Sequence, residues 1–365
     1  MHILLAGEWV VDVYEAALMQ AFLQLGHTVT PFPWRHYVAR ARGPVSVSPG
    51  WWAAKLSTHF GLAPLLARVG DGLVDLARRS QPDVIFIYRG IVIPPRTLAR
   101  LRQAAPRAVI VGYNNDDPFA PANPAWLWRH FTAALPDYDL VLTFRALNLD
   151  EFRAAGAKRT NLLRGWFVPW IHRPLALGPA DHQQFDCDVV FVGHYEPDGR
   201  IDHLEAIAKA GFRLRLFGGN WHKAPRRDWL DRQRPIRPVF GDDYAKAIRG
   251  AKVALAFLSS RNRDTYTTRS FEIPACGGFM LSQFTADLAG LFRDGVEAEF
   301  FHSRDDMIAK IGHACANAAM RARIAGAGHR RVFADRHDVM SRAADLIDGL
   351  TPLVAERRQR IGRTA

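Results

Sequence analysis

With 365 residues, 48% of them apolar and 23% charged, the chain has the composition of a globular protein with room for two domains, which excludes a disordered or fibrous protein. No apolar run is long enough to span a bilayer, and the first one, residues 2–6, is too short for a secretory signal, so we expect a cytoplasmic protein. The formal net charge of +12 favours acidic partners, but the arginines are dispersed and no nucleic-acid recognition signature occurs, which argues against nucleic acid.

The first half of the chain alternates short apolar runs with helical patterns. Strands are expected at residues 2–6, 28–32, 83–88, 108–113 and 139–143, and helices at 13–25, 65–79, 95–105, 126–134 and 147–155. This alternation predicts a parallel sheet that is covered by helices on both faces.

Between residues 168 and 186 several prolines interrupt the periodicity, so we interpret this segment as an interdomain linker. The alternation then resumes, with strands expected at 188–193, 213–218, 253–258 and 279–282, helices at 200–210, 244–250 and 270–276, and only helices thereafter. The predicted domains are residues 1–175 and 176–340. A C-terminal helix and basic tail follow at 341–365, for which packing back on the first domain is one arrangement.

In open parallel sheets, ligands bind beyond the carboxyl ends of the strands. This rule selects five loops, at residues 7–13, 114–119, 193–200, 218–222 and 259–269.

The last of these loops leads into the segment with the most chemical information, Asp264-Thr-Tyr-Thr-Thr-Arg-Ser-Phe-Glu272. A helix that begins near residue 270 offers free backbone N–H groups and a positive dipole end, which suit a diphosphate. Thr267 and Thr268 either cap this helix or bind a ligand through their hydroxyl groups. Glu272 either complements the helix dipole or binds a ligand.

Residues 270–281, Ser-Phe-Glu-Ile-Pro-Ala-Cys-Gly-Gly-Phe-Met-Leu, resemble the nucleotide-sugar motif of retaining GT-B glycosyltransferases, family 4 in particular. They are more similar still to the CgeB-like (spore maturation protein) group, whose landmarks the residues at 115–118, 138–143, 191–193 and 241–245 also resemble. The resemblance implies an α/β fold of two Rossmann-like domains facing each other across a cleft. It also implies that the second domain holds a nucleoside diphosphate sugar, the first holds the acceptor, and no metal or further cofactor is bound.

The resemblance assigns roles to individual residues. Glu272 matches the second acid of the family's paired-acid motif, which binds the ribose hydroxyls of the donor. The first acid falls on Asp264, where the family usually has Glu, so its reach toward the sugar is shorter. Arg269 and the N–H groups of Thr267 and Thr268 would contact the diphosphate or the sugar.

Two further loops of the second half supply candidates. Gly193 permits close approach to a phosphate, and Arg200 is a candidate for stabilising the leaving diphosphate. The alternative is an ordinary turn with a surface arginine. Gly218 and Gly219 either lie beside the donor base or only form a turn.

In the first half, Asp116 is the candidate for a catalytic or acceptor-side role, and the alternative is that Asp116 and its neighbour Asp117 cap the loop before a proline. Glu8, Asp12 and Glu15 are rivals for the acceptor base. Tryptophans are candidates for stacking on a sugar, inserting into a membrane surface or packing in the core; they are Trp34, Trp51 and Trp52.

The leading hypothesis is transfer of a sugar from a nucleoside diphosphate sugar to a hydroxyl group of a carbohydrate, lipid-linked or protein acceptor, with retained anomeric configuration. Two alternatives stay open: a nucleotide-sugar epimerase on the same fold, and a non-catalytic nucleotide-sugar-binding protein. The basic excess also has two interpretations, solvated surfaces or peripheral docking to the inner face of a membrane or to an anionic acceptor.

Overall fold

The computed structural model describes residues 1–39 and 63–362 and divides into two compact units. Unit 1 comprises Met1–Arg164 together with Val339–Ala365, and unit 2 comprises Gly165–Asp338. Each unit is described by itself. Trp51 and Trp52 lie outside the described residues.

Unit 1 is built on a six-stranded parallel sheet in the order β2-β1-β3-β4-β5-β6. Its strands are β1 His2–Gly7, β2 Thr28–Pro33, β3 Val84–Tyr88, β4 Val109–Asn114, β5 Leu140–Thr143 and β6 Thr160–Leu162. Every residue of β3 and β4 is buried, as expected for apolar strands in a sheet that is covered on both faces.

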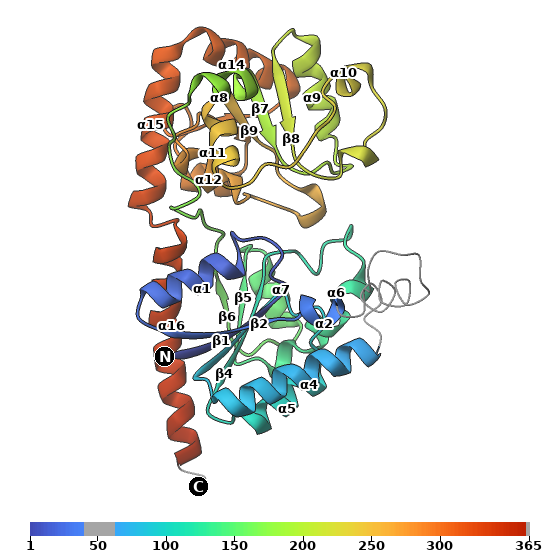
Figure 1. Cartoon of the computed structure of the whole chain (residues 1–365), viewed down its shortest axis with the longest axis vertical. Coiled ribbons are helices and arrows are strands. Elements are labelled where there is room, and N and C mark those ends of the chain that lie inside the picture. Colours follow the sequence, from blue (N-terminus) through green and yellow to red (C-terminus); the bar gives the residue numbers. More distant parts are fainter. Residues whose placement is uncertain (40–62, 363–365) are drawn as a thin grey trace. The chain divides into compact units, whose positions relative to one another are not determined.

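Helices cover both faces of this sheet. They are α1 Glu15–Gln24, α2 Arg35–Ala39, α4 Ala63–Ser80, α5 Pro95–Ala104, α6 Ala125–Ala133, η1 Leu135–Asp137, α7 Asn148–Ala154 and α16 Val339–Gly362. Helices α4 and α5 lie side by side, and α1 lies against α16 (Figure 1). Helix α16 buries one residue in every three or four from Val339 to Val354, which places one apolar face against unit 1.

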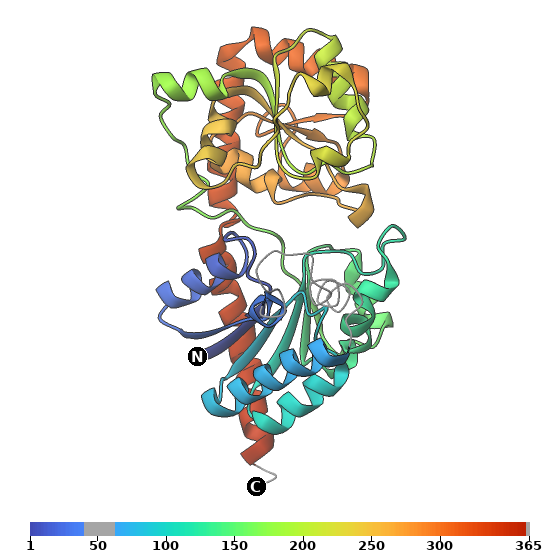
Figure 2. The same cartoon turned by 45° about the vertical axis from the view of Figure 1, so that its right-hand side comes forward.

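Unit 2 contains a five-stranded parallel sheet in the order β11-β10-β9-β7-β8 (Figure 2). Its strands are β7 Cys187–Val192, β8 Leu214–Phe217, β9 Ala251–Ala256, β10 Met280–Gln283 and β11 Glu299–Phe301. The chain passes from β7 outward to β8 and then returns to the other side of β7 with β9. The point at which the strand order reverses, where ligands of doubly wound sheets bind, therefore lies between β7 and β9.

The helices of unit 2 pack on both faces of its sheet. They are α8 Pro179–Phe185, α9 Arg200–Lys209, η2 Trp221–Lys223, α10 Asp228–Asp231, α11 Gly241–Arg249, η3 Ser260–Asn262, α12 Arg269–Ala275, α13 Ala286–Leu291, α14 Arg304–Ala316 and α15 Ala318–Ala334. Helices α9 and α14 contact each other over one core, which contains Val189 and Phe191 of β7 and Leu255 of β9.

The whole segment interpreted as a linker, residues 168–186, belongs to unit 2. The amide of Gly165 donates to Tyr266 Oη (3.1 Å), and the amide of Phe167 donates to the carbonyl of His337 (3.1 Å). Residues 179–185 form α8 despite the prolines, because Pro179 occupies the first turn, where no backbone donor is needed. The unit boundaries therefore fall at residues 164 and 338, earlier than the predicted 175 and 340.

Two short strands were not predicted. The expectation that only helices follow residue 282 is wrong, because β11 at Glu299–Phe301 extends the sheet beside β10. Strand β6 likewise extends the first sheet beside β5. Each spans three residues, too few to show a period. Within the described residues, no helix is both long and apolar enough to cross a membrane.

Candidate functional site

The loops that follow β7 and β9 meet at the carboxyl edge of the second sheet. Ser259 Oγ, after β9, donates to Glu196 Oε2, after β7, at 2.5 Å. The guanidinium of Arg269, at the start of α12, lies 5.8 Å from the centre of the Phe191 ring of β7. The segment identified from the sequence therefore lies at the switch point of this sheet.

Glu272 lies in the first turn of α12 and is 7% exposed. Tyr244 Oη donates to its Oε2 atom at 2.7 Å. Its other oxygen, Oε1, lies 3.9 Å from His172 Nε2, which is too long for a hydrogen bond. The carboxylate is thus fixed through one oxygen while the second keeps its capacity to accept hydrogen bonds.

Burial sets the protonation of both neighbours of Glu272. Burial raises the pKa of Tyr244 well above its usual value, and the nearby Glu272 charge adds to the effect, so the phenol stays a donor. Burial also lowers the pKa of His172, against the opposing effect of Glu272. The amide of Val168 donates to His172 Nδ1 (2.9 Å), which leaves the proton of the neutral ring on Nε2, facing the carboxylate.

Unpaired donors lie one turn before Glu272. Within the described residues, no acceptor pairs with the amides of Thr268 and Arg269, and Arg269 Nε is buried without a hydrogen-bond partner. The amide of Thr267, by contrast, donates to Ser270 Oγ (3.2 Å). An unsatisfied buried donor such as Arg269 Nε costs about 1–3 kcal/mol, and the first amides of a helix have no intrahelical acceptor, so these groups suit a ligand that supplies acceptors.

Asp264 is engaged with its own loop. Its Oδ2 atom accepts from the amide of Ser259 (3.3 Å), and its amide donates to the Ser259 carbonyl (3.0 Å). These bonds close the turn around η3 and agree with the short reach of an aspartate. A sugar contact or catalytic role for Asp264 stays a prediction.

Arg200 is buried and its charge is already balanced. Its guanidinium binds both carboxylate oxygens of Asp198 (2.8 and 2.5 Å), lies 3.3 Å from Glu196 and donates to the His194 carbonyl (2.7 Å). This pairing disfavours the predicted role at the leaving diphosphate and indicates that Arg200 shapes the loop after β7. Arg269 is the better placed cation.

The three glycines predicted to bind the donor have structural reasons of their own. Gly218 has φ +136°, and a Cβ atom there would lie 2.0 Å from the carbonyl oxygen of Gly193. The amides of Gly193, Gly218 and Gly219 donate to Phe217 O (2.8 Å), Arg237 O (3.0 Å) and His194 Nδ1 (3.1 Å). The glycines therefore allow the loops after β7 and β8 to pack together, and none of these amides is free for a phosphate.

In unit 1, Asp116 belongs to a charged cluster at the carboxyl edge of the sheet. Arg89, after β3, lies 2.9 Å from Asp116, after β4, and 3.5 Å from Glu8, after β1. Asp117 is buried, and its Oδ1 atom accepts from the amide of Phe119 (3.0 Å), so this acid caps the loop. An acceptor-side role for Asp116 stays a prediction.

The rivals of Asp116 are not equivalent. Glu15 is buried, accepts from the amides of Glu8 (2.9 Å) and Trp9 (3.3 Å), and has its pKa raised by burial. It therefore holds the loop after β1. Asp12 is exposed. Trp34 is 2% exposed and packs in the core, which excludes stacking on a sugar.

Sequence reasoning missed Tyr244, His172 and Glu196 as members of the site. Tyr244 lies within the landmark at residues 241–245, which drew attention to the segment but not to this side chain. His172 lies in the segment taken for a linker. Only the fold brings Tyr244 and His172 beside Glu272, and Glu196 beside Ser259.

One family model matches part of the chain. Residues 200–348 match a family model described as glycosyl transferase-like. The matched residues run from α9 of unit 2 into α16 of unit 1. The match confirms the predicted enzyme class, a glycosyltransferase. No curated protein matches the sequence.

Solved structures match nearly the whole chain. HepE from Anabaena in complex with UDP-glucose is similar over 96% of this chain and 100% of its own, with 16% identity and a TM-score of 0.65. Sucrose-phosphate synthase from Thermosynechococcus elongatus matches over 98% and 100%, with 14% identity and a TM-score of 0.69. The α,α-trehalose 6-phosphate synthase from Burkholderia multivorans matches over 98% of both chains, with 13% identity and a TM-score of 0.60. The predicted fold class, an α/β protein of two Rossmann-like domains as in GT-B structures, is confirmed.

Proposed function

We propose that this chain transfers a sugar from a nucleoside diphosphate sugar, bound at the switch point of unit 2, to a hydroxyl group of an acceptor. One observation carries the proposal: Tyr244 holds the buried Glu272 carboxylate through one oxygen, while its second oxygen stays open one turn from unpaired donors. This arrangement offers acceptors for ribose and donors for a diphosphate. The family match over residues 200–348 supports it.

The proposed binding mode follows from the chemistry of each group. The ribose hydroxyls donate to Glu272 Oε1, and a carboxylate accepts such bonds strongly because it is charged. The diphosphate accepts from the free amides of Thr268 and Arg269 and from the Arg269 guanidinium. HepE, which shares the fold, has been solved with UDP-glucose.

The proposed reaction breaks the bond between the anomeric carbon and the diphosphate oxygen. Negative charge then develops on the diphosphate, where Arg269 stabilises it. The acceptor oxygen bonds to the anomeric carbon on the face that the diphosphate leaves, and its proton passes to a carboxylate, for which Asp116 and Asp264 are the candidates. From the resemblance to retaining GT-B glycosyltransferases of family 4 we further propose retention of configuration and no requirement for a divalent ion.

The acceptor class is proposed more broadly, as a carbohydrate, a lipid-linked molecule or a protein. A lipid-linked acceptor is compatible with peripheral contact with the inner face of a membrane. The charged cluster of Glu8, Arg89 and Asp116 is the proposed acceptor-side feature of unit 1.

Thermal-shift screening against nucleoside diphosphates and their sugars, beginning with UDP-glucose, identifies the donor. Hydrolysis of that donor is then compared in wild type, Glu272→Ala and the control Glu205→Ala, which removes a glutamate of α9 that pairs with Arg227. We expect Glu272→Ala to abolish saturable hydrolysis and the control to preserve it. Equal rates in all three proteins would remove Glu272 from the mechanism.

A non-catalytic nucleotide-sugar-binding protein is the second candidate, because Asp264 is shorter than the usual glutamate and bonds to its own loop. The same screen separates the two. Donor binding without hydrolysis or transfer, across a panel of donors and simple acceptors, would favour the binding protein.

A further inference from the structure

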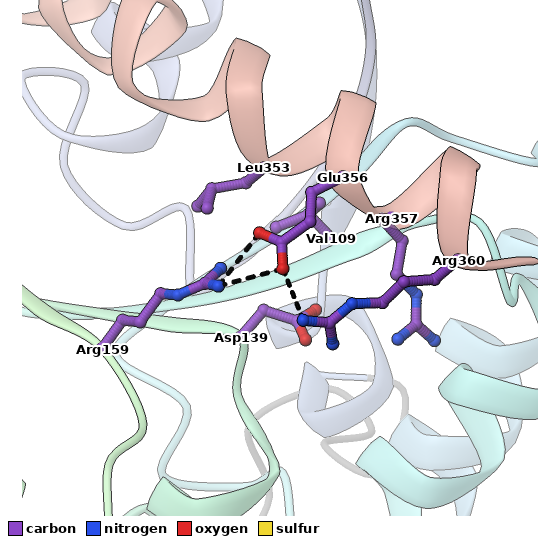
Figure 3. A pocket seen from close by; sticks show the side chains of 7 residues that line it. All are labelled: Val109, Asp139, Arg159, Leu353, Glu356, Arg357 and Arg360. Atoms are coloured by element: carbon purple, nitrogen blue, oxygen red, sulfur yellow. Dashed lines mark hydrogen bonds and ion pairs between the residues drawn. The ribbon is translucent and has the colours of Figure 1, made fainter.

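A cluster of arginines lies at the amino-terminal edge of the sheet in unit 1, opposite the edge that carries Asp116. Figure 3 shows a small cavity beneath α16, at the amino ends of β4, β5 and β6. Its lining residues are Val109, Asp139, Arg159, Leu353, Glu356, Arg357 and Arg360. The cavity measures about 30 Å³, the volume of one water molecule in the liquid.

Positive charge is in excess around this cavity. Arg102 of α5 lies 2.9 Å from Asp139, Arg159 binds Glu356 at 3.0 Å, and Arg360 of α16 also binds Glu356 at 2.5 Å. With Arg357, four guanidinium groups face two carboxylates.

The excess of positive charge is centred on Arg357. Its Nε atom donates to the carbonyl of Pro106 (2.8 Å), whereas its two terminal nitrogens donate to no other described residue. Burial lowers the pKa of Arg357, and the neighbouring Arg102 and Arg360 lower it further, against the opposing effect of Asp139. A partly buried guanidinium with free donors beside other cations is stabilised by an anion.

We propose that this arginine cluster, defined as Arg102, Arg159, Arg357 and Arg360, binds a phosphate-type dianion. The planar fork of a guanidinium matches the oxygens of a phosphate in a bidentate geometry, which a point charge does not. In this binding mode one phosphate oxygen fills the cavity and the others face Arg159 and Arg360, whose side chains are partly exposed.

The anion would join elements that are distant in sequence. Arg357 and Arg360 lie on α16, whereas Arg102 lies on α5 and Arg159 directly before β6. Binding therefore stabilises the docking of α16 on unit 1. The site is independent of the proposed donor site, because every residue of the arginine cluster belongs to unit 1.

The test is the thermal unfolding of the full chain in increasing inorganic phosphate, with sodium chloride adjusted to hold the ionic strength constant. We expect the melting temperature of the wild type to rise with saturation, by about 3 °C at ten times the dissociation constant. Arg357→Met, which keeps the apolar stem, should abolish this rise. Arg358→Met is the matched control, because Arg358 is the next residue on the helix and pairs with Asp83 outside the cavity.

Phosphate binding at the donor site would raise the melting temperature of all three proteins equally, and that result overturns the proposal, as does the absence of any rise. A second variant, Arg357→Lys, keeps the charge without the fork and should weaken phosphate binding at least fivefold if the helix stays folded by circular dichroism. Flotation with phosphatidylcholine vesicles containing phosphatidic acid identifies the source of the phosphate group. Flotation that Arg357→Met abolishes indicates a lipid headgroup, whereas no flotation together with the phosphate-dependent rise indicates a soluble phosphorylated molecule.

Discussion

Replacing Glu272 by glutamine tests whether its carboxylate charge is used in donor binding. The amide oxygen of glutamine can still accept from Tyr244 Oη, which lies 2.7 Å from the present carboxylate, so the fold of α12 should persist. Donor hydroxyls would then bond to a neutral group in place of a charged one. Hydrogen bonds to charged groups contribute about 1.5–3 kcal/mol and neutral ones about 0.5–1.5 kcal/mol.

The difference, about 1–2 kcal/mol for a single bond to Oε1, corresponds to a dissociation constant about 5–30 times higher, since 1.4 kcal/mol is tenfold. The assay is isothermal titration calorimetry with the nucleotide sugar that stabilises the wild type most strongly. Glu205→Gln is the control, because Glu205 is a partly buried glutamate of the same unit that pairs with Arg227. A dissociation constant within twofold of wild type for Glu272→Gln would refute the assignment of ribose binding to this carboxylate.

Further predictions concern stability. Arg200→Met should destabilise unit 2 by about 3–5 kcal/mol in urea unfolding, because it leaves Asp198, whose side chain is 3% exposed, as an unpaired buried charge. A folded variant of wild-type stability with abolished hydrolysis would instead restore the catalytic role of Arg200. Gly218→Ala should cost more than about 2 kcal/mol, because it combines a strained φ of +136° with a backbone clash, whereas Gly199→Ala, with φ +88° and no atom within 4 Å, should cost about 1 kcal/mol. Equal costs would contradict the clash. Because burial lowers the folded-state pKa of His172, the folded protein binds fewer protons there than the unfolded chain, and the stability that this residue contributes is lost as the pH falls below about 6.5. As the pH is lowered from 7 to 5, the urea concentration at the unfolding midpoint should therefore decrease less in His172→Asn than in wild type. An equal decrease in both proteins would contradict the burial of a neutral ring.

The strands that carry the site could be predicted from the sequence, because a short continuous apolar run between turn residues is typical of a strand that is buried on both faces of a sheet. β3, β4, β7 and β9 are each five or six residues of nearly continuous apolar character, and all were predicted within two residues. Helix α12 was predicted on different grounds, from its motif and its position after a strand.

The site was predicted less completely, because hydrogen-bond partners depend on tertiary structure. The motif identified Glu272, but Tyr244, 28 positions earlier in the sequence, becomes its partner only through the packing of α11 against the sheet. Arg200 appeared to be a free cation because its pairing with Asp198 is local and side-chain geometry is not visible in a sequence. Gly193 and Gly218 were predicted to bind a phosphate, but they allow two loops to pack closely instead. The sequence does not separate these two roles, because each requires a residue without a side chain.

The last helix also has a consequence for biosynthesis. Because α16 completes the packing of unit 1, a ribosome has translated all of unit 2 before unit 1 can acquire its final layer. Gly165–Asp338, in contrast, is one uninterrupted stretch whose two ends pair with each other through Phe167 and Asp338. Nascent unit 2 is therefore able to fold first, while the earlier part of unit 1 still lacks the helix that covers its apolar surface. A truncation that removes the buried residues of α16, from Val339 to Val354, uncovers that surface of unit 1.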